Sequence, residues 1–406
     1  MLPSAVPRTT HRAHTMGSAV DLYAAQRVPG ALLDQLVAGG AGIEVHGIYP
    51  DHLAAVMPHA RQVHTGHAFG PDKRFNVVRP RFFTVPASET GRARLVVAVP
   101  PGNDYVLHYA SLIRHYLGAR RLPAGALTGV FRYPRAETSL ADWTRLADLV
   151  EPGDRVLMGY VGELVPLLLE GGGSARETRA NDFYGAVRVG FASGESVCAL
   201  GVRFSFWGCI AARLLVALQR LGASEIVYAG KLGTLTSPDD IYRRLFVPSA
   251  YLVADSAAGV AVDATPRNAL LEFCPALDSG LHMSVGTVLE EDVHQRAYAD
   301  EHGVQTIDNE ISQMAMALGR TPGGPRASFS ALHFATDYLR RPGEEERRDL
   351  DNLTNHRMRG ALRRKQRVLQ EVAGVLCAYY GGGTSPAGAP RRRGRALPVD
   401  GLARGG

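Results

Sequence analysis

Hydrophobic residues form two patterns along the chain: short apolar runs, and longer stretches in which apolar residues recur every three or four positions. The short β-branched runs predict buried strands, among them residues 95–99, 155–161 and 225–229. A one-sided stripe of leucine and isoleucine predicts a helix over residues 206–221, with Ser205 as its N-cap and Gly222 at its end. Because strands alternate with helices, the pattern predicts an α/β fold whose mixed sheet is covered by helices.

Further elements follow from the same pattern. Residues 186–191 and 196–202 are predicted to form a β-hairpin. Residues 306–319 indicate the end of a strand that runs into a helix, and residues 329–339 a last strand with polar residues at its carboxyl end. The C-terminal part predicts a helix with a stripe of apolar residues: Leu362, Leu369, Val372 and Leu376.

Turn signals and composition divide the chain into five segments. They are a disordered lead-in (1–18), an N-terminal α/β region of unknown role (19–150), a main α/β domain (151–343), a C-terminal helical segment (344–380) and a disordered basic tail (381–406). We therefore expect a mixed sheet flanked by helices, with an N-terminal α/β extension and a C-terminal helix.

The composition is that of an ordinary globular protein. With 406 residues, of which 46% are hydrophobic and 21% charged, the chain is neither a mini-protein that needs covalent staples nor a fully disordered polypeptide. The formal net charge of +6 comes mostly from arginines near the two ends. Because the arginine-rich tail lacks interleaved aromatic residues, we expect no specific nucleic-acid partner.

The sequence predicts no membrane span, no secretory signal and no metal site. No run of 18 apolar residues occurs, which argues against a membrane span, and the first residues lack the apolar core of a secretory signal. The four cysteines show no C-x-x-C spacing, so we expect reduced core thiols in a cytoplasmic protein. The histidines are not spaced as zinc ligands are, and no metal site is predicted.

Polar and glycine-rich loops follow several predicted strands. In open α/β sheets, ligands bind beyond the carboxyl ends of the strands. The candidate loops there are residues 201–205, 230–235, 284–288 and 308–310, with Asp337 as a fifth position.

The order and spacing of these pieces resemble the purine nucleoside phosphorylase and nucleosidase superfamily over roughly residues 153–340. The most specific stretch is GVRFSFWGCIAARLLVALQRLGASEIVYAGKLGTL, followed by GVQTIDNEISQMA and by HFATDYL. The resemblance implies a nucleoside-phosphorylase-like mixed sheet. It also implies the cleavage of an N-glycosidic bond, with a nucleoside as the small-molecule substrate.

Two carboxylates match the catalytic positions of the family. Glu310 matches the residue that binds the ribose 2′- and 3′-hydroxyls, and Asp337 matches the acid that protonates the departing purine at N7. The chemistry needs both, because the sugar becomes positively charged while the base takes the bonding electrons. Each residue also has a structural interpretation, since Glu310 suits a helix N-terminus and Asp337 suits the N-cap of a short helix.

The residues at the family's phosphate-binding positions depart from the family pattern. Tyr228 and Lys231 stand where an arginine and a serine or threonine are usual. Lys231, Arg203 and the backbone at Gly230 are the residues that we expect to rebuild an anion site. The alternatives are a nucleosidase that uses water, a Lys231 that binds a phosphate of the substrate itself, and a Lys231 that is only a solvated loop charge.

The base and sugar positions are also altered. Gly286 and Val288 replace an acid and an aromatic residue of the loop that lines the base, and Asn309 replaces a methionine beneath the ribose. We therefore expect Thr287 and Asn309, with Glu310, to contact an unusual base or sugar.

The function expected from the sequence is cleavage, or reverse formation, of the N-glycosidic bond of a purine-type nucleoside. Inorganic phosphate would be the co-substrate, with no organic cofactor, and the resemblance implies a homo-oligomer. The alternatives are a hydrolytic nucleosidase, and a regulatory module that senses nucleosides and has lost catalysis.

Overall fold

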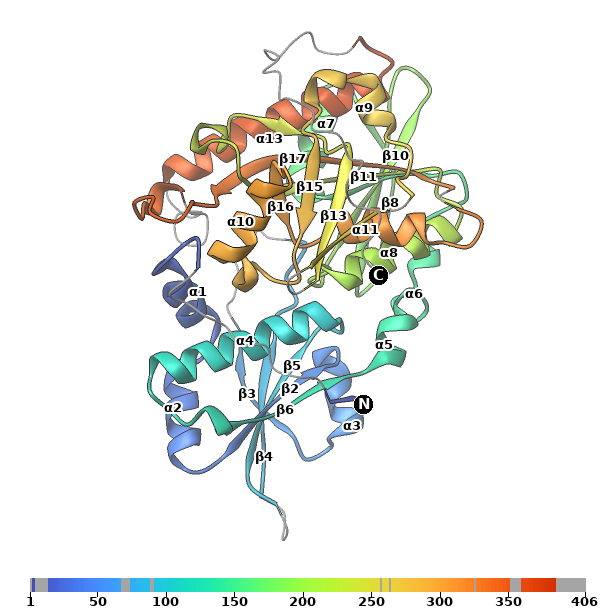
Figure 1. Cartoon of the computed structure of the whole chain (residues 1–406). Coiled ribbons are helices and arrows are strands. Elements are labelled where there is room, and N and C mark those ends of the chain that lie inside the picture. The colour runs from blue at the N-terminus through green and yellow to red at the C-terminus, as the bar shows by residue number, and fades with distance from the viewer. Residues whose placement is uncertain are drawn as a thin grey trace.

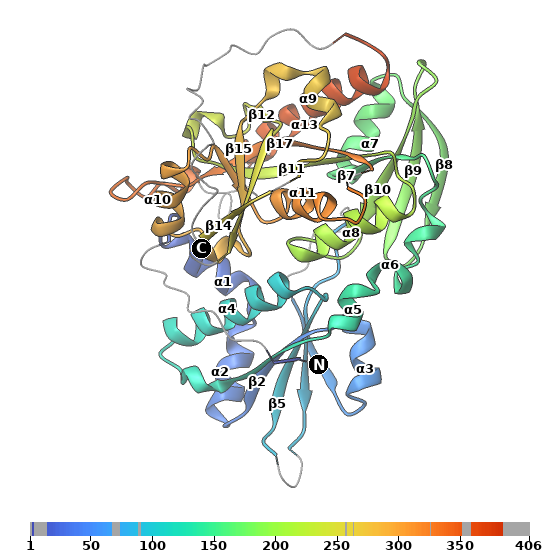
Figure 2. The ribbon, with the colours of Figure 1, turned by 45° about the vertical axis from the view of Figure 1, so that its right-hand side comes forward.

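The chain folds into two β-sheets, each flanked by helices (Figure 1). The computed structural model describes residues 2–3, 14–66, 74–87, 91–255, 258–262, 264–324, 326–350 and 359–384. Helix α4 lies between the two sheets in both views, and α5 and α6 lead from the smaller sheet to the larger one (Figures 1 and 2).

The N-terminal region contains a six-stranded sheet in the order β1-β6-β2-β5-β4-β3. Its strands are β1 (Leu2–Pro3), β2 (Gly42–Gly47), β3 (Arg61–Thr65), β4 (Arg81–Val85), β5 (Arg94–Val99) and β6 (Leu127–Arg132). Its helices are α1 (Ala19–Arg27), α2 (Gly30–Ala38), α3 (Leu53–Val56), α4 (Asn103–Ala119), α5 (Pro134–Thr138) and α6 (Leu140–Trp143), with short 3-10 turns at Pro50–His52, Ala124–Ala126 and Leu146–Asp148. Strand β2 is parallel to both β5 and β6, so α4 is the crossover that joins β5 to β6.

The larger sheet has eleven strands in the order β14-β13-β15-β16-β11-β7-β10-β9-β8, with β17 paired to β11 and β12. The strands are β7 (Arg155–Gly159), β8 (Ser174–Ala180), β9 (Tyr184–Gly190), β10 (Ser196–Val202), β11 (Glu225–Thr234), β12 (Leu245–Phe246), β13 (Ala250–Asp255), β14 (Ala258–Ala261), β15 (Leu281–Ser284), β16 (Thr306–Asp308) and β17 (Ser328–Tyr338). Strand β11 is parallel to β7 and β17 but antiparallel to β16. The predicted α/β class with a mixed sheet is therefore confirmed.

Helices cover both faces of the larger sheet (Figure 1). They are α7 (Val161–Glu170), α8 (Cys209–Arg220), α9 (Ala269–Phe273), α10 (Val293–Glu301), α11 (Ile311–Gly319) and α13 (Arg359–Tyr380), with 3-10 turns at Pro238–Asp240, Pro275–Leu277, Val288–Glu290 and Arg348–Leu350. Helices α8 and α11 share one apolar core, and α7 and α13 share another. The predicted stripe on α13 is correct except at Leu362, whose side chain is 50% exposed.

Two local predictions need correction. Helix α8 begins at Cys209 rather than at residue 206, and Ser205 does not cap it. The backbone N–H of Cys209 is instead bound by the Asp104 carboxylate of α4, at 2.6 Å. Strand β11 continues through residues 230–234, which the glycines had predicted as a loop, because β17 pairs with it along its whole length.

The start of the chain packs against the main domain. His14 and Thr15, predicted within a disordered lead-in, are buried and bond to the carbonyls of Val288 and Glu291. The predictions for residues 4–13 and for the tail from residue 385 lie outside the described residues. One apolar core joins α1 and α4 to residues that follow β11, β15 and β17, so the N-terminal region is not a separate body.

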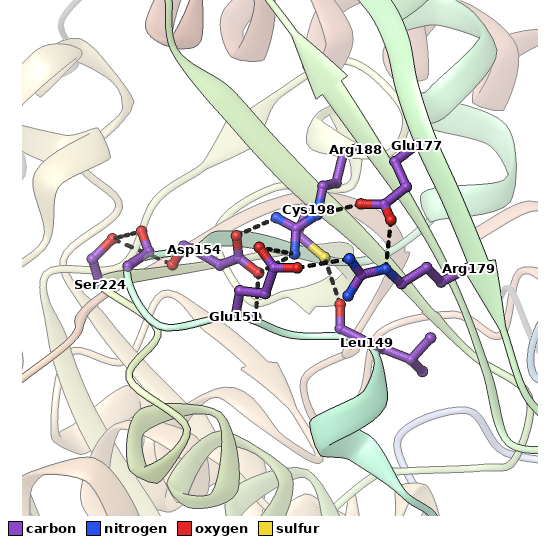
Figure 3. A network of polar contacts seen from close by, with 9 residues as sticks. Leu149, Glu151, Asp154, Glu177, Arg179, Arg188, Cys198 and Ser224 are labelled. Atoms are coloured by element: carbon purple, nitrogen blue, oxygen red, sulfur yellow. Dashed lines mark hydrogen bonds and ion pairs between the residues drawn. The ribbon is translucent and has the colours of Figure 1, made fainter.

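An ion-pair network fixes one edge of the larger sheet (Figure 3). The Arg188 guanidinium on β9 bonds to both carboxylate oxygens of Asp154 and to Glu177 on β8. Arg179 bonds to Glu177 and to Glu151, closing the network. These contacts tie the turn before β7 to the β8–β9 hairpin.

Candidate functional site

The carboxyl ends of β11 and β17 face the N-terminal region. Leu235 and Leu339, just beyond these two strands, share an apolar core with Tyr105 and Tyr109 of α4. Figure 2 shows α1 and α4 between the smaller sheet and the strands of the larger one. These strand ends therefore lie beside helices of the N-terminal region.

Lys231 and Asp337 lie on one face of the β11–β17 pair. Gly233 stands opposite Asp337, and alternate residues of a strand share a face, so Lys231 points to the same side as Gly233. A β-bulge in β17 opposite Leu232 and Gly233 brings Asp337, rather than Thr336, to this position. Bulges of this kind re-aim side chains next to functional sites.

The surrounding protein shifts the pKa of both groups. Desolvation raises the pKa of Asp337, while the Lys231 charge and a 2.6 Å hydrogen bond from Thr336 act in the opposite direction. Desolvation lowers the pKa of Lys231, although its side chain remains accessible, and the Asp337 charge opposes this change. Lys231 makes no hydrogen bond or ion pair with the described residues, so its ammonium group is available to a ligand.

Glu310 lies at the N-terminus of α11, directly after β16. Burial raises its pKa well above the usual value, and the neighbouring Asp308 charge and a hydrogen bond to Asp308 raise it further. The Lys231 charge opposes this shift. Glu310 therefore holds a proton more readily than an exposed carboxyl group does, and it lies within electrostatic reach of Lys231.

Asp308 accepts several hydrogen bonds at this end of the site. Its carboxylate accepts hydrogen bonds from His282 at 2.8 Å, from Ser284 at 2.5 Å and from the backbone of Glu310 and Ile311. Burial raises the pKa of Asp308, but the His282 charge and hydrogen bond outweigh this and lower it. The sequence placed Asp308 in a candidate loop but gave neither Asp308 nor His282 a role, because the strand register that joins them is not visible in it.

Gly230 lies inside β11 and not in an anion-binding loop. It stands opposite His333 of β17, and a Cβ on Gly230 would lie 2.5 Å from Nε2 of that ring. The Tyr228 ring packs edge-on against His333, with 4.7 Å between centroids. Burial lowers the pKa of His333 to about 3, and neither ring nitrogen has a partner among the described residues.

Arg203 directly follows β10 and contacts the N-terminal region. Its charge acts on Tyr49 of the N-terminal region, and its backbone carbonyl accepts hydrogen bonds from Val77 and Val78. The charges that act on Lys231 are those of Asp337, Lys365, Arg27 and Glu310. The expected pairing of Arg203 with Lys231 stays a prediction.

Thr287 and Asn309 already have partners within the protein. The Thr287 hydroxyl lies 2.7 Å from Nδ1 of His108 in α4 and accepts the backbone N–H of Leu289. The Asn309 amide donates to the Val285 carbonyl at 3.0 Å. Thr287 thus holds the N-terminal region in place, and the expected contacts of both residues with substrate stay predictions.

The described residues contain neither a candidate metal site nor a candidate membrane span. No group of three or more His, Cys, Asp or Glu side chains there is arranged to hold a metal ion. None of the helices there is both long and apolar enough to cross a membrane.

The sequence is similar to a curated fungal protein. No protein-family model matches the chain. Oxidoreductase cns1 of Cordyceps militaris is 34% identical over 365 residues, which are 83% of this chain and 45% of that protein. The chain therefore spans less than half the length of this relative.

Solved structures similar to the chain include phosphorylases and nucleosidases. Uridine phosphorylase from Vibrio fischeri ES114 is 13% identical, with a TM-score of 0.42 over 58% of this chain and 93% of that one. The purine nucleoside phosphorylase of Toxoplasma gondii is 17% identical, with a TM-score of 0.40 over 57% and 92%. The 5′-methylthioadenosine nucleosidase of Arabidopsis thaliana is 15% identical, with a TM-score of 0.41 over 56% and 95%.

Proposed function

We propose that this chain breaks or forms the N-glycosidic bond of a purine-type nucleoside, with Asp337 as the acid for the base and Glu310 at the sugar hydroxyls. The observation that carries the proposal is the β17 bulge, which places Asp337 opposite Gly233 on the face of the sheet that carries Lys231. The three side chains come from β11, β17 and the loop after β16, which are far apart in the sequence but adjacent in the sheet.

The reaction requires a proton for the leaving base. When the bond between C1′ and N9 breaks, the bonding electrons go to the purine, which takes a proton at N7. Desolvation raises the pKa of Asp337, so this group keeps its proton closer to neutral pH, as a general acid must. A phosphate or water oxygen then bonds to C1′, and the proton that this nucleophile loses returns to Asp337.

Glu310 would hold the sugar as a neutral carboxyl group. Its proton is engaged in the hydrogen bond to Asp308. The remaining carboxyl oxygen accepts a hydrogen bond from a ribose hydroxyl. The Asp308 charge, fixed by His282 and Ser284, keeps Glu310 in this orientation.

Phosphate is the proposed nucleophile, with Lys231 as its cation. Hydrolysis is the second candidate, because Gly230 lies within strand β11 rather than in an anion-binding loop, and its backbone is engaged in the sheet. The fungal relative is named an oxidoreductase, so a redox reaction is a third activity to measure. A module that binds nucleosides without turnover is the remaining alternative.

The test is release of free purine from a panel of nucleosides, separated by chromatography, with and without phosphate and with nicotinamide absorbance followed in parallel. We expect base release that Asp337→Asn lowers about 100-fold or more. The matched control is Asp239→Asn, whose side chain is 87% exposed, and its rate should stay unchanged.

The outcomes separate the candidates. Release only with phosphate supports phosphorolysis, and release without it supports hydrolysis. Saturable nucleoside binding without release would overturn the proposal of an enzyme and favour a sensor. A nucleoside-dependent change in nicotinamide absorbance would favour an oxidoreductase. An unchanged rate in Asp337→Asn removes this residue from the mechanism.

A further inference from the structure

The first turn of α4, in the N-terminal region, is fixed against the start of α8. The Asp104 carboxylate accepts the backbone N–H of Cys209 through Oδ2 at 2.6 Å, and the Cys209 sulfur accepts the backbone N–H of Asn103 at 3.2 Å. Gly208 permits this approach, because a Cβ there would overlap Asp104 Oδ2. The position of the Asp104 carboxylate is therefore set by the backbone of the main domain.

Hydrogen bonds connect the start of α8 to the loop after β15 and to the start of α11. The Gly208 N–H donates to the Asn309 carbonyl at 3.1 Å, and the Asn309 side-chain amide donates to the Val285 carbonyl at 3.0 Å. Because Asn309 directly precedes Glu310, these contacts bring the Asp104 carboxylate to the same strand ends as Glu310.

The second oxygen of Asp104 lies beside Gly286 in the loop after β15. Oδ1 is 3.7 Å from the point that a Cβ on Gly286 would occupy, so no side chain at residue 286 covers this oxygen. The Asp104 side chain remains partly exposed. Glu290 is also close to this loop, but its Oε2 accepts the Gly286 N–H at 3.2 Å. Asp104 Oδ1 is therefore an acceptor at the edge of the candidate site.

The neighbours of Asp104 act on it as donors. The Asn103 side-chain amide lies 3.4 Å from Oδ1, which is long for a hydrogen bond and leaves this oxygen able to accept a stronger one. Burial raises the pKa of Asp104, while hydrogen bonds from Cys209, Asn103 and Gln313 act in the opposite direction. Donors on several sides favour the ionised form, in which both oxygens accept.

We infer that Asp104 contacts the base of the nucleoside and accepts a hydrogen bond from an amino group, so that the chain selects a 6-aminopurine over a 6-oxopurine. The inference rests on the proposed function, because it takes a nucleoside whose sugar lies at Glu310. A 6-amino group donates hydrogen bonds, whereas a 6-oxygen only accepts them and is repelled by a carboxylate. A site with one fixed acceptor distinguishes two such bases, since the wrong base leaves that acceptor without a partner.

The experiment is isothermal titration calorimetry of the full chain with adenosine and inosine, which carry an amino group and an oxygen at C6. We expect the native chain to bind adenosine about 10-fold or more tightly than inosine, as a hydrogen bond to a charged acceptor implies. Asp104→Asn should abolish or reverse this preference. Its side-chain oxygen still accepts the Cys209 N–H, so its Tm should stay near the native Tm, while its amide can donate to a 6-oxygen.

A second variant leaves the contact between Asp104 and Cys209 intact. The methyl group of Gly286→Ala would touch Asp104 Oδ1 and should weaken binding of adenosine more than binding of inosine. It would also lie 3.1 Å from Glu290 Oε2, the end of a flexible side chain that can shift. The matched control is Asp142→Asn, an exposed acid of α6, which should bind both nucleosides as the native chain does.

The outcomes separate this inference from the proposed function. Binding of neither nucleoside, equal or tighter binding of inosine by the native chain, or a preference that survives in both variants would overturn the inference. Base release from both nucleosides without preference would leave the proposed function standing and remove the inference. A preference for adenosine that depends on Asp104, in a chain that releases no base, would keep the inference and remove the proposed function.

Discussion

The Asp337 carboxylate lies over Gly233 of the neighbouring strand, with Oδ2 only 3.0 Å from the point that a Cβ on this glycine would occupy. The bulge in β17 produces this arrangement, because without it Thr336 would face Gly233 and Asp337 would point to the other face of the sheet. The absence of a side chain at Gly233 is thus what leaves room for Asp337 beside Lys231.

Gly233→Ala should therefore impair catalysis more than stability. The new methyl group would contact Asp337 Oδ2 and the end of the Leu339 side chain, at 2.7 Å, and both can shift. We expect kcat for base release to fall about 10-fold, with a loss in the free energy of unfolding of about 1 kcal/mol. The check is kcat and chemical denaturation, beside Gly118→Ala, where a Cβ meets nothing within 4 Å. A native kcat in Gly233→Ala would contradict the placement of Asp337.

Glu310→Gln should keep much of the function that Glu310→Ala loses. An amide donates to Asp308 and presents an oxygen to the sugar, as the protonated carboxyl group does. We expect KM for the nucleoside to rise less than about 3-fold in the glutamine variant and about 10-fold or more in the alanine variant. Equal losses in both would show that the carboxylate form is the one that binds.

The pH dependence of stability offers a second measurement on Glu310. Its pKa is higher in the folded than in the unfolded chain, so the folded state binds more protons. Stability must then fall as the pH rises from the unfolded value through the folded one. Glu310→Gln does not lose stability in this way, so its Tm minus the native Tm should increase from about pH 5 to about pH 8. A constant difference in Tm across this range would contradict the raised pKa.

The local patterns of the chain were enough to predict much of the fold. The apolar runs located β5 and β7, the β9–β10 hairpin and the strand that leads into α11, since each depends on neighbouring residues. Asp337, Glu310 and Lys231 could be chosen because they end predicted strands. Pairing between distant segments was not predictable: β17 extends β11 through Gly230, and Phe183 pairs with the backbone of Arg203.

Gly230→Ala should destabilise the chain. A Cβ there would lie 2.5 Å from the His333 ring, which is fully buried and packs against Tyr228. Overpacking of this kind costs about 1–3 kcal/mol in the free energy of unfolding. Denaturant titration measures it, with Gly374→Ala as the control because its Cβ would meet no other atom within 4 Å. If Gly230 were an open-loop glycine, the two variants would have equal stability.

Arg188→Met should show how much the ion-pair network of Figure 3 stabilises the sheet edge. The Arg188 and Asp154 side chains are only 15% and 10% exposed, so removing the guanidinium leaves a poorly solvated carboxylate without its main partner. Such a loss costs more than the roughly 0–1 kcal/mol of an exposed pair, and we expect about 2 kcal/mol. Arg243→Met is the control, because Arg243 and Asp239 are 71% and 87% exposed. Denaturation at low and high salt gives a second readout. Added salt should lower the stability of the native protein more than that of Arg188→Met, because screening weakens only the intact network. Equal stability of Arg188→Met and Arg243→Met would mean that the network is no stronger than a surface pair.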